Sequence, residues 1–185
     1  MNLSKQHPLY FIAILPPLGI RKEIEGFKEK IREDHDIKHA LKLPAHITIQ
    51  IPFRISKEQE QELISKLHIF SNVTHPFPIN LDGFGKFDKS VIFIKIKNHD
   101  PVIKLHSKLT EMIRSFIPLK SHEISSKIHP HVTIAVRDLK RSNFQPVWED
   151  FEIREYKNSF IFDQLVLFKH NGKTWDSINK FSIQQ

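Results

Sequence analysis

Two segments of the sequence share one four-residue pattern: a histidine, an apolar residue, a threonine and a second apolar residue. The first is His46-Ile47-Thr48-Ile49, and the second is His131-Val132-Thr133-Ile134. Each lies in a short apolar, β-branched run that predicts a strand, so the histidine and threonine of each copy share one face of that strand. Each copy also follows a predicted strand and helix. One copy alone would suit ordinary sheet packing, but two matched copies favour a shared functional site.

The remaining apolar patterns predict the other elements. Residues 9–15 predict a buried first strand, and residues 20–31 carry apolar positions at helical spacing. Ser56 with Gln59 predicts a capping box at the start of a second helix. The same reasoning predicts strands over 45–51, 77–84, 91–97 and 128–136, a helix with Asp100 as its N-cap, a short helix over 144–151, and strands over 156–170 and 173–183 joined by a two-residue turn at Asn171-Gly172.

This order of elements lacks the regular alternation of strands and helices that builds a doubly wound parallel sheet. We therefore expect an α+β fold with largely antiparallel sheets. No Gly/Ser-rich linker interrupts the sequence, so we expect residues 1–185 to form a single domain.

The composition narrows the classes of function. The net charge of +7 and the pI near 9.5 favour a polyanionic partner or substrate, although a generally lysine-rich surface explains them equally well. The absence of cysteine excludes disulfides, cysteine-ligated zinc and thiol catalysis. No apolar run is long enough to cross a membrane, and no signal-peptide cleavage site follows the first run. We expect a cytoplasmic, monomeric protein.

The repeated histidine and threonine suit phosphoryl chemistry. A neutral imidazole takes a proton from an attacking water while a protonated imidazole gives one to the departing oxygen. Threonine hydroxyls donate hydrogen bonds to the oxygens on which charge develops. We expect neither a metal nor another cofactor. The pairs His35 with His39 and His129 with His131 have spacings that could suit two zinc ligands. A zinc site needs a third protein ligand, and no carboxylate lies at a suitable spacing from either pair.

The two motifs and their flanking residues resemble the two-histidine (2H) phosphoesterase superfamily, whose best-known branch holds 2′-5′ RNA ligases and RNA 2′,3′-cyclic phosphodiesterases. Residues 10–16 are similar to the family's opening strand, 43–49 to its first motif and 129–135 to its second. The resemblance implies a bilobal fold, with two pseudo-symmetric antiparallel sheets, outer helices and a central cleft that carries both motifs. It also implies an enzyme that opens 2′,3′-cyclic phosphates on RNA ends or nucleotides to a 2′-phosphate, with reverse 2′-5′ RNA ligation.

Motif position assigns the site residues that the resemblance implies. His46 and His131 would be the catalytic pair, and Thr48 and Thr133 would hold the phosphate. Arg137 would join them if the second motif strand continues unbroken, because alternate residues of a strand share a face.

Four further residues have two readings each. Phe11, Phe53 and Phe84 would either stack on a base at the cleft or pack in the core. Lys127 would either neutralise a flanking phosphate or lie in solvent.

Two other functions stay open. The chain could be an RNA- or nucleotide-binding module that uses the same cleft without turnover. It could also be a phosphodiesterase for another small cyclic phosphate, such as ADP-ribose cyclic phosphate. The segment 50–53 departs from the family's usual ending of the first motif, which leaves the substrate open.

Overall fold

The computed structural model describes residues 7–184, which form four α-helices and one eight-stranded antiparallel sheet. The α+β fold expected from the sequence is confirmed. The strands are β1 (Leu9–Ile14), β2 (Ile47–Arg54), β3 (Phe77–Phe87), β4 (Val91–Ile96), β5 (His131–Val136), β6 (Lys157–Phe162), β7 (Gln164–His170) and β8 (Trp175–Ser182). The helices are α1 (Leu18–His35), α2 (Lys57–Asn72), α3 (Asp100–Arg114) and α4 (Phe144–Glu152), with short 3₁₀ turns η1 (His39–Lys42), η2 (Ser121–Glu123) and η3 (Arg141–Asn143).

The two motif strands meet at the centre of the sheet. The strand order is β6-β3-β4-β5-β2-β1-β7-β8, so β5 and β2 are direct neighbours with three strands outside each. Their antiparallel pairing consists of a single residue pair, Ile47 with Val132, whereas every other neighbouring pair of strands is joined over five or more. Where two sheets were expected, the structure has one, because this pair connects its halves.

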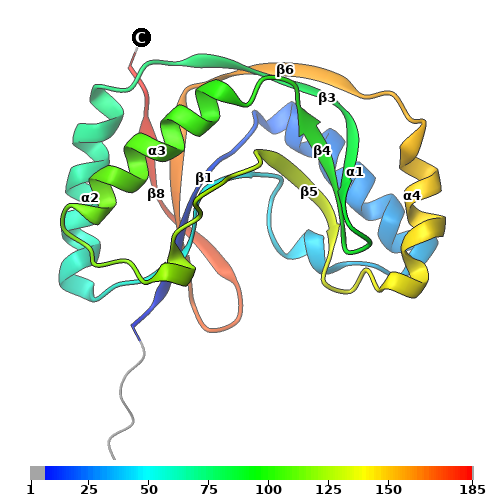
Figure 1. The fold of residues 1–185 in the computed structure, drawn as a ribbon, viewed down its shortest axis with the longest axis horizontal. Coiled ribbons are helices and arrows are strands. Elements are labelled where there is room, and N and C mark those ends of the chain that lie inside the picture. The colour runs from blue at the N-terminus through cyan, green and yellow to red at the C-terminus, as the bar shows by residue number, and fades with distance from the viewer. Residues whose placement is uncertain (1–6, 185) are drawn as a thin grey trace, which may run out of the picture.

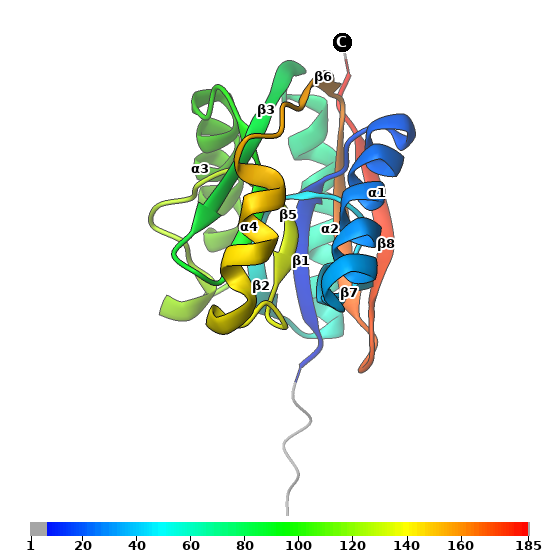
Figure 2. The ribbon, with the colours of Figure 1, turned by 90° about the vertical axis from the view of Figure 1, so that its right-hand side faces the viewer.

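The helices cover the halves in crossed order. Helix α1 follows β1 in the chain but packs on β5, and α3 follows β4 but packs on β2. Figure 1 shows α2 and α3 at one end of the molecule and α1 and α4 at the other. Figure 2 shows α1 and α4 next to each other, and His35 of α1 contacts Asp150 of α4 at 2.8 Å. Each half is therefore covered by a helix whose preceding strand belongs to the other half.

The first strand is buried on both faces. Tyr10, Ile12 and Ile14 enter the main core beneath the helices, which draws on both halves of the sheet. Phe11 and Ala13 belong to a second, smaller cluster with Val166 and Phe168 of β7. Since successive side chains of a strand alternate between faces, this second cluster lies on the face opposite the main core.

The region after α4 differs from the prediction. Residues 156–170 were expected to form one strand, but they form β6, paired with β3, and β7, paired with β1, which lie near opposite edges of the sheet. Only Asp163 separates the two strands, and no glycine or proline marks the change of partner. The following loop has four residues, 171–174, rather than two, since β7 ends at His170 and β8 begins only at Trp175. Within this loop Asn171 N donates to Thr174 O at 3.0 Å.

Several ends of strands and helices also differ from the prediction. Strand β2 continues through Pro52 to Arg54, beyond the predicted end, and β5 begins only at His131. Asp100 is the first residue of α3 rather than its cap. His99 occupies the N-cap position, and the side chain of Asn98 accepts a hydrogen bond from Asp100 N at 3.2 Å.

A buried histidine links α3 to the site strands. The ring nitrogens of His106 lie 2.7 Å from Ile49 O in β2 and 3.1 Å from Ser125 O, in the segment that leads to His131. The ring therefore joins the first motif strand to the approach of the second. None of the helices within residues 7–184 is both long and apolar enough to cross a bilayer.

The predicted capping box of α2 is confirmed. Ser56 Oγ accepts from Gln59 N at 3.3 Å, and the Gln59 side chain accepts from Ser56 N at 3.0 Å. We expect Ser56→Ala to lower the free energy of unfolding by about 1 kcal/mol, since it removes an N-cap acceptor. Urea unfolding followed by circular dichroism measures the change. Ser65→Ala is the matched control, because Ser65 is exposed in the middle of the same helix. An equal loss in both variants would contradict the capping role.

Candidate functional site

The two motifs have the alternating burial that the sequence predicts. Ile47 and Ile49 of the first motif, like Val132 and Ile134 of the second, are at most 1% exposed. The histidines and threonines between them are partly exposed. The polar pair of each motif therefore faces away from the main core.

The central residue pair aligns the two motifs. Ile47 is opposite Val132 in antiparallel register, so continuing that register sets His46 opposite Thr133 and Thr48 opposite His131. All four side chains alternate with these two apolar residues and so share one face. A cavity of about 390 Å³ is lined by His46 and Thr133 together, while His131 and Thr48 lie outside its lining.

Both motif histidines are held by the same kind of hydrogen bond, from Nδ1 to a backbone carbonyl two residues earlier. His46 Nδ1 lies 2.8 Å from Pro44 O, and His131 Nδ1 lies 2.6 Å from His129 O. A carbonyl oxygen only accepts, so each Nδ1 carries the proton and donates it. In the neutral ring this leaves Nε2 unprotonated and free to react. The two rings therefore present the same atom in the same protonation state.

Phenylalanines from the neighbouring strands pack against each ring. Phe11 of β1 lies 5.4 Å from the His46 ring and stacks on Phe168 of β7 at 4.6 Å, measured between ring centroids. Phe93 of β4 and Phe87 of β3 each lie 5.0 Å from the His131 ring. Each imidazole thus has an apolar wall on one side.

The position of Phe93 depends on a glycine in the adjacent strand. Gly85 of β3 is paired with Phe93 across the sheet, and a Cβ added at Gly85 would lie 2.7 Å from the Phe93 ring. Only glycine allows the ring to lie this close to the neighbouring backbone.

The base-stacking expectations for the phenylalanines are not supported by their positions. Phe53 is 0% exposed and packs in the main core, so no base could reach it. Phe84 is also buried there, 6% exposed, against Phe27 and Phe151. Phe11 is 3% exposed, and its ring is covered by its neighbours, so it forms the wall of the site.

Burial keeps both motif histidines neutral in the free protein. Burial lowers the pKa of His46 to about 4; the Pro44 hydrogen bond opposes this shift, while the charges of Lys28 and His131 add to it. Burial also lowers the pKa of His131, opposed by its bond to His129 O. The like charges of His129 and His99 lower it further.

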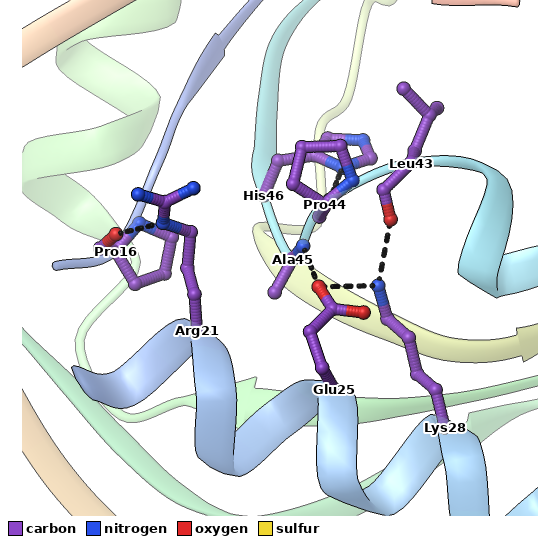
Figure 3. Close-up of polar contacts among 8 residues, drawn as sticks. All are labelled: Pro16, Arg21, Glu25, Lys28, Leu43, Pro44, Ala45 and His46. Carbon is purple, nitrogen blue, oxygen red and sulfur yellow. Dashed lines mark hydrogen bonds and ion pairs between the residues drawn. The ribbon is translucent and has the colours of Figure 1, made fainter. Parts of the chain in front are cut away.

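Helix α1 fixes the segment that precedes His46, as Figure 3 shows. Glu25 Oε1 accepts from Ala45 N at 2.7 Å and pairs with Lys28 Nζ at 3.3 Å, which in turn donates to Leu43 O at 2.9 Å. Lys28 is only 2% exposed, and its burial lowers its pKa while the Glu25 charge opposes the shift. The pair holds the backbone on both sides of Pro44 and leaves a cation beside the His46 ring.

Arg137 reaches the site by a route other than the predicted one. The strand does not continue to it, because β5 ends at Val136 and Arg137 has a φ of 64°. Asp138 N donates to Val136 O at 2.8 Å, which closes a tight turn around Arg137. Arg137 nevertheless lines the cavity with His46 and Thr133. A positive φ at a non-glycine residue is strained and is often found at functional sites.

The cavity also contains residues that the motifs did not indicate. They come from α1, η1 and the β7–β8 hairpin: Lys28, His39, Lys42, His170, Lys173, Thr174 and Trp175. No local pattern identifies them, since their proximity to His46 arises only in the folded chain. The net charge of +7 was the one sequence signal of a basic site.

The remaining candidates lie elsewhere. Lys127 lines a different cavity, beside α3, and not the one at His46. His35 pairs with Asp150, while His39 lines the His46 cavity. Within residues 7–184, no cluster of three or more His, Cys, Asp or Glu side chains is arranged to bind a metal ion.

Known proteins resemble this chain over nearly its whole length. A phosphoesterase-like protein of Geobacillus kaustophilus, named "Putative phosphoesterase", is 26% identical over 94% of this chain and 95% of its own. Escherichia coli LigT, in a complex with 3′-AMP, matches with a TM-score of 0.69 and 21% identity over 98% of this chain and all of LigT. A Thermus thermophilus protein matches with a TM-score of 0.67 and 18% identity, over 95% and 97% of the two chains. These structures share the fold.

The model of one protein family matches most of the sequence. It describes the 2′-5′ RNA ligase superfamily and covers residues 16–174, which include both histidine motifs. The protein therefore belongs to the 2′-5′ RNA ligase superfamily.

Proposed function

We propose that the protein is a phosphodiesterase that opens 2′,3′-cyclic phosphates on RNA ends or nucleotides and leaves a 2′-phosphate. The observation that carries this proposal is the matched pair of imidazoles. Each ring donates Nδ1–H to a carbonyl two residues before it, and each motif lies on one of the two strands that meet at Ile47 and Val132. Two such rings supply a base and an acid on opposite sides of one phosphorus.

The reaction needs one proton to be taken and one to be given. Water attacks the phosphorus and loses a proton to the Nε2 of the neutral ring. The bond from phosphorus to the 3′ oxygen breaks, and that oxygen takes a proton from the protonated ring. When a 5′-hydroxyl replaces water as the nucleophile, the two rings keep these roles and the product is a 2′-5′ linkage. The rings exchange roles in the reverse step, in which the 3′-hydroxyl attacks, the cyclic phosphate re-forms and the 5′ oxygen takes the proton. Thr48, Thr133 and Arg137 would stabilise the charge on the non-bridging oxygens.

The surroundings of the two rings support a two-lobed, pseudo-symmetric site. Outward from each motif strand, the next two strands supply the aromatic wall: β1 and β7 beside His46, and β4 and β3 beside His131. We propose that the phosphate occupies a central cleft between the halves, with the motif strands as its floor.

The relatives support a nucleotide substrate. The family is named for an RNA ligase, and LigT structures are described as complexes with 3′-AMP, ATP and NADP+. We extend this preference to the present chain, whose cavity beside His46 is basic. The substrate we propose is a nucleotide or an RNA end that carries the cyclic phosphate.

Single replacements test the catalytic pair. We expect His46→Ala and His131→Ala each to lower kcat for an adenosine 2′,3′-cyclic phosphate substrate by about 10²- to 10⁴-fold, the usual contribution of a general acid or base. His75→Ala, at an exposed histidine outside the site, should retain wild-type activity. The product is identified by phosphorus NMR as the 2′-monoester, and activity should persist in EDTA. Binding without turnover would instead favour a binding module, and loss of activity in EDTA would contradict metal-independent catalysis.

The pH dependence of kcat/KM tests the protonation states. Above pH 6.5 both rings are neutral and no acid is present, because both pKa values are lowered from 6.5. Below the pKa of His46, about 4, that ring is charged and no longer acts as a base. We therefore expect a bell-shaped profile with its maximum between these two limits. The profile of kcat should lie at higher pH, since a bound phosphate anion raises both pKa values. A kcat/KM maximum above pH 7.5 would contradict this account.

A further inference from the structure

We infer that the cavity beside His46 binds a second phosphate of the substrate, one ribose away from the cyclic phosphate. This inference rests on the proposed function and specifies its substrate class. The preferred substrate is then a nucleoside 2′,3′-cyclic phosphate that also carries a 5′-phosphate, or an RNA end whose last internucleotide phosphate occupies the same position.

The charges that line the cavity exceed what one cyclic phosphate requires. Four cationic side chains line it, namely Lys28, Lys42, Arg137 and Lys173, and among the described residues no Asp or Glu does. Lys28 is paired with Glu25, whereas the other three make no ion pair within residues 7–184. A cyclic phosphodiester has a single negative charge. The remaining positive charge in a concave site attracts a further anion.

One wall of the cavity is held in place by the end of β5. Asp138 Oδ2 accepts from Lys38 N at 2.9 Å and from His39 N at 2.8 Å, which fixes the start of η1 beside Arg137. Asp138 forms no ion pair with Lys42, at the end of η1, within residues 7–184. Burial lowers the pKa of His39, and the charges of Arg137 and Lys42 lower it further, while the charge of Asp138 opposes the shift.

The opposite wall is the loop of the β7–β8 hairpin, and it is also ordered by side-chain contacts. Asn171 Oδ1 accepts from Lys173 N at 2.9 Å and from Thr174 N at 2.8 Å, and Asn171 Nδ2 donates to Asp176 Oδ2 at 3.0 Å. Figure 1 shows this orange-red loop projecting from the lower side of the sheet. Lys173 is therefore presented by a shaped loop, with the Trp175 ring beside it in the cavity lining.

The His131 side of the junction differs in character. Phe87, Phe93 and His129 surround that ring, and the first two are apolar. His99 packs in turn on His129. Burial and the His99 charge lower the pKa of His129. One lysine lies on this side as well, because Lys95 of β4 is paired with His131 across the sheet. The four cations that line a single cavity all lie on the His46 side, so a second anion of the substrate extends in that direction.

Substrate comparison tests the inference. The three substrates are adenosine 2′,3′-cyclic phosphate, its 5′-phosphorylated form, and a dinucleotide that ends in the same cyclic phosphate. We expect kcat/KM to rise by about tenfold or more with either second phosphate, equivalent to about 1.4 kcal/mol. A gain with the 5′-phosphate alone identifies nucleotides as the preferred source, and a gain with the dinucleotide identifies RNA ends. Equal kcat/KM for all three overturns the inference and leaves the proposed function intact.

Two matched double variants test whether the gain in kcat/KM from the second phosphate depends on the lysines of this cavity. Lys42→Ala/Lys173→Ala should reduce the preference to within about twofold, mainly through KM, because it removes the two wall lysines. Lys22→Ala/Lys104→Ala removes the same charge from exposed positions on α1 and α3 and should keep the preference. Equal loss in both double variants would mean that net charge alone, rather than this site, produces the preference.

A binding measurement separates the inference from the proposed function. Calorimetry compares adenosine 2′-phosphate with adenosine 2′,5′-bisphosphate, neither of which requires turnover. We expect about tenfold tighter binding of the bisphosphate to the wild-type protein, and a loss of this difference in Lys42→Ala/Lys173→Ala. Tighter bisphosphate binding by a protein without turnover would refute the proposed function and retain the second phosphate site. Equal affinities would refute the site.

Discussion

The arrangement of the candidate site depends on one antiparallel residue pair at the centre of the sheet. Within residues 7–184, Ile47 and Val132 form the only residue pair between β2 and β5, and both are completely buried. Their side chains enter the core, so the residues on either side of them turn to the opposite face. A shift of this pair by one residue would send a motif's histidine and threonine into the core, which burial of the apolar residues strongly opposes.

The sheet sets the face on which the two histidines lie, and local hydrogen bonds then fix their tautomers and the backbone before His46. The Nδ1 bonds to Pro44 O and His129 O select one tautomer for each ring, and α1 fixes the backbone before His46 through Glu25 and Lys28. The crossed helices make this arrangement cooperative, because α1 packs on the strand that carries the second motif while it holds the segment before the first. A disturbance of α1 would therefore reach both motifs.

The sequence predicts those features whose cause is local. The capping box needs only Ser56 and Gln59, and the facing of each motif follows from alternation within one strand. The break between β6 and β7 was missed because only Asp163 separates the two strands, and no glycine or proline marks the point at which the pairing partner changes. Arg137 reaches the cavity because it lies in a turn with a positive φ, and the sequence has no glycine or asparagine there that would have predicted such a turn. Lys42 and Lys173 are far apart in the chain, and only the fold brings them to one cavity.

The same surroundings that hold the rings also determine when they acquire a proton. Burial lowers the pKa of both histidines, and Lys28 lowers that of His46 further, so the unliganded pair is neutral near pH 7. A neutral pair contains a base but no acid. The phosphate that we propose to bind between the rings would add a negative charge and raise the pKa of both. Since the two protonated rings repel each other, the first proton that binds makes the second less favourable. Binding of an anionic ester would thus be linked to uptake of one proton, which converts two equal imidazoles into one acid and one base.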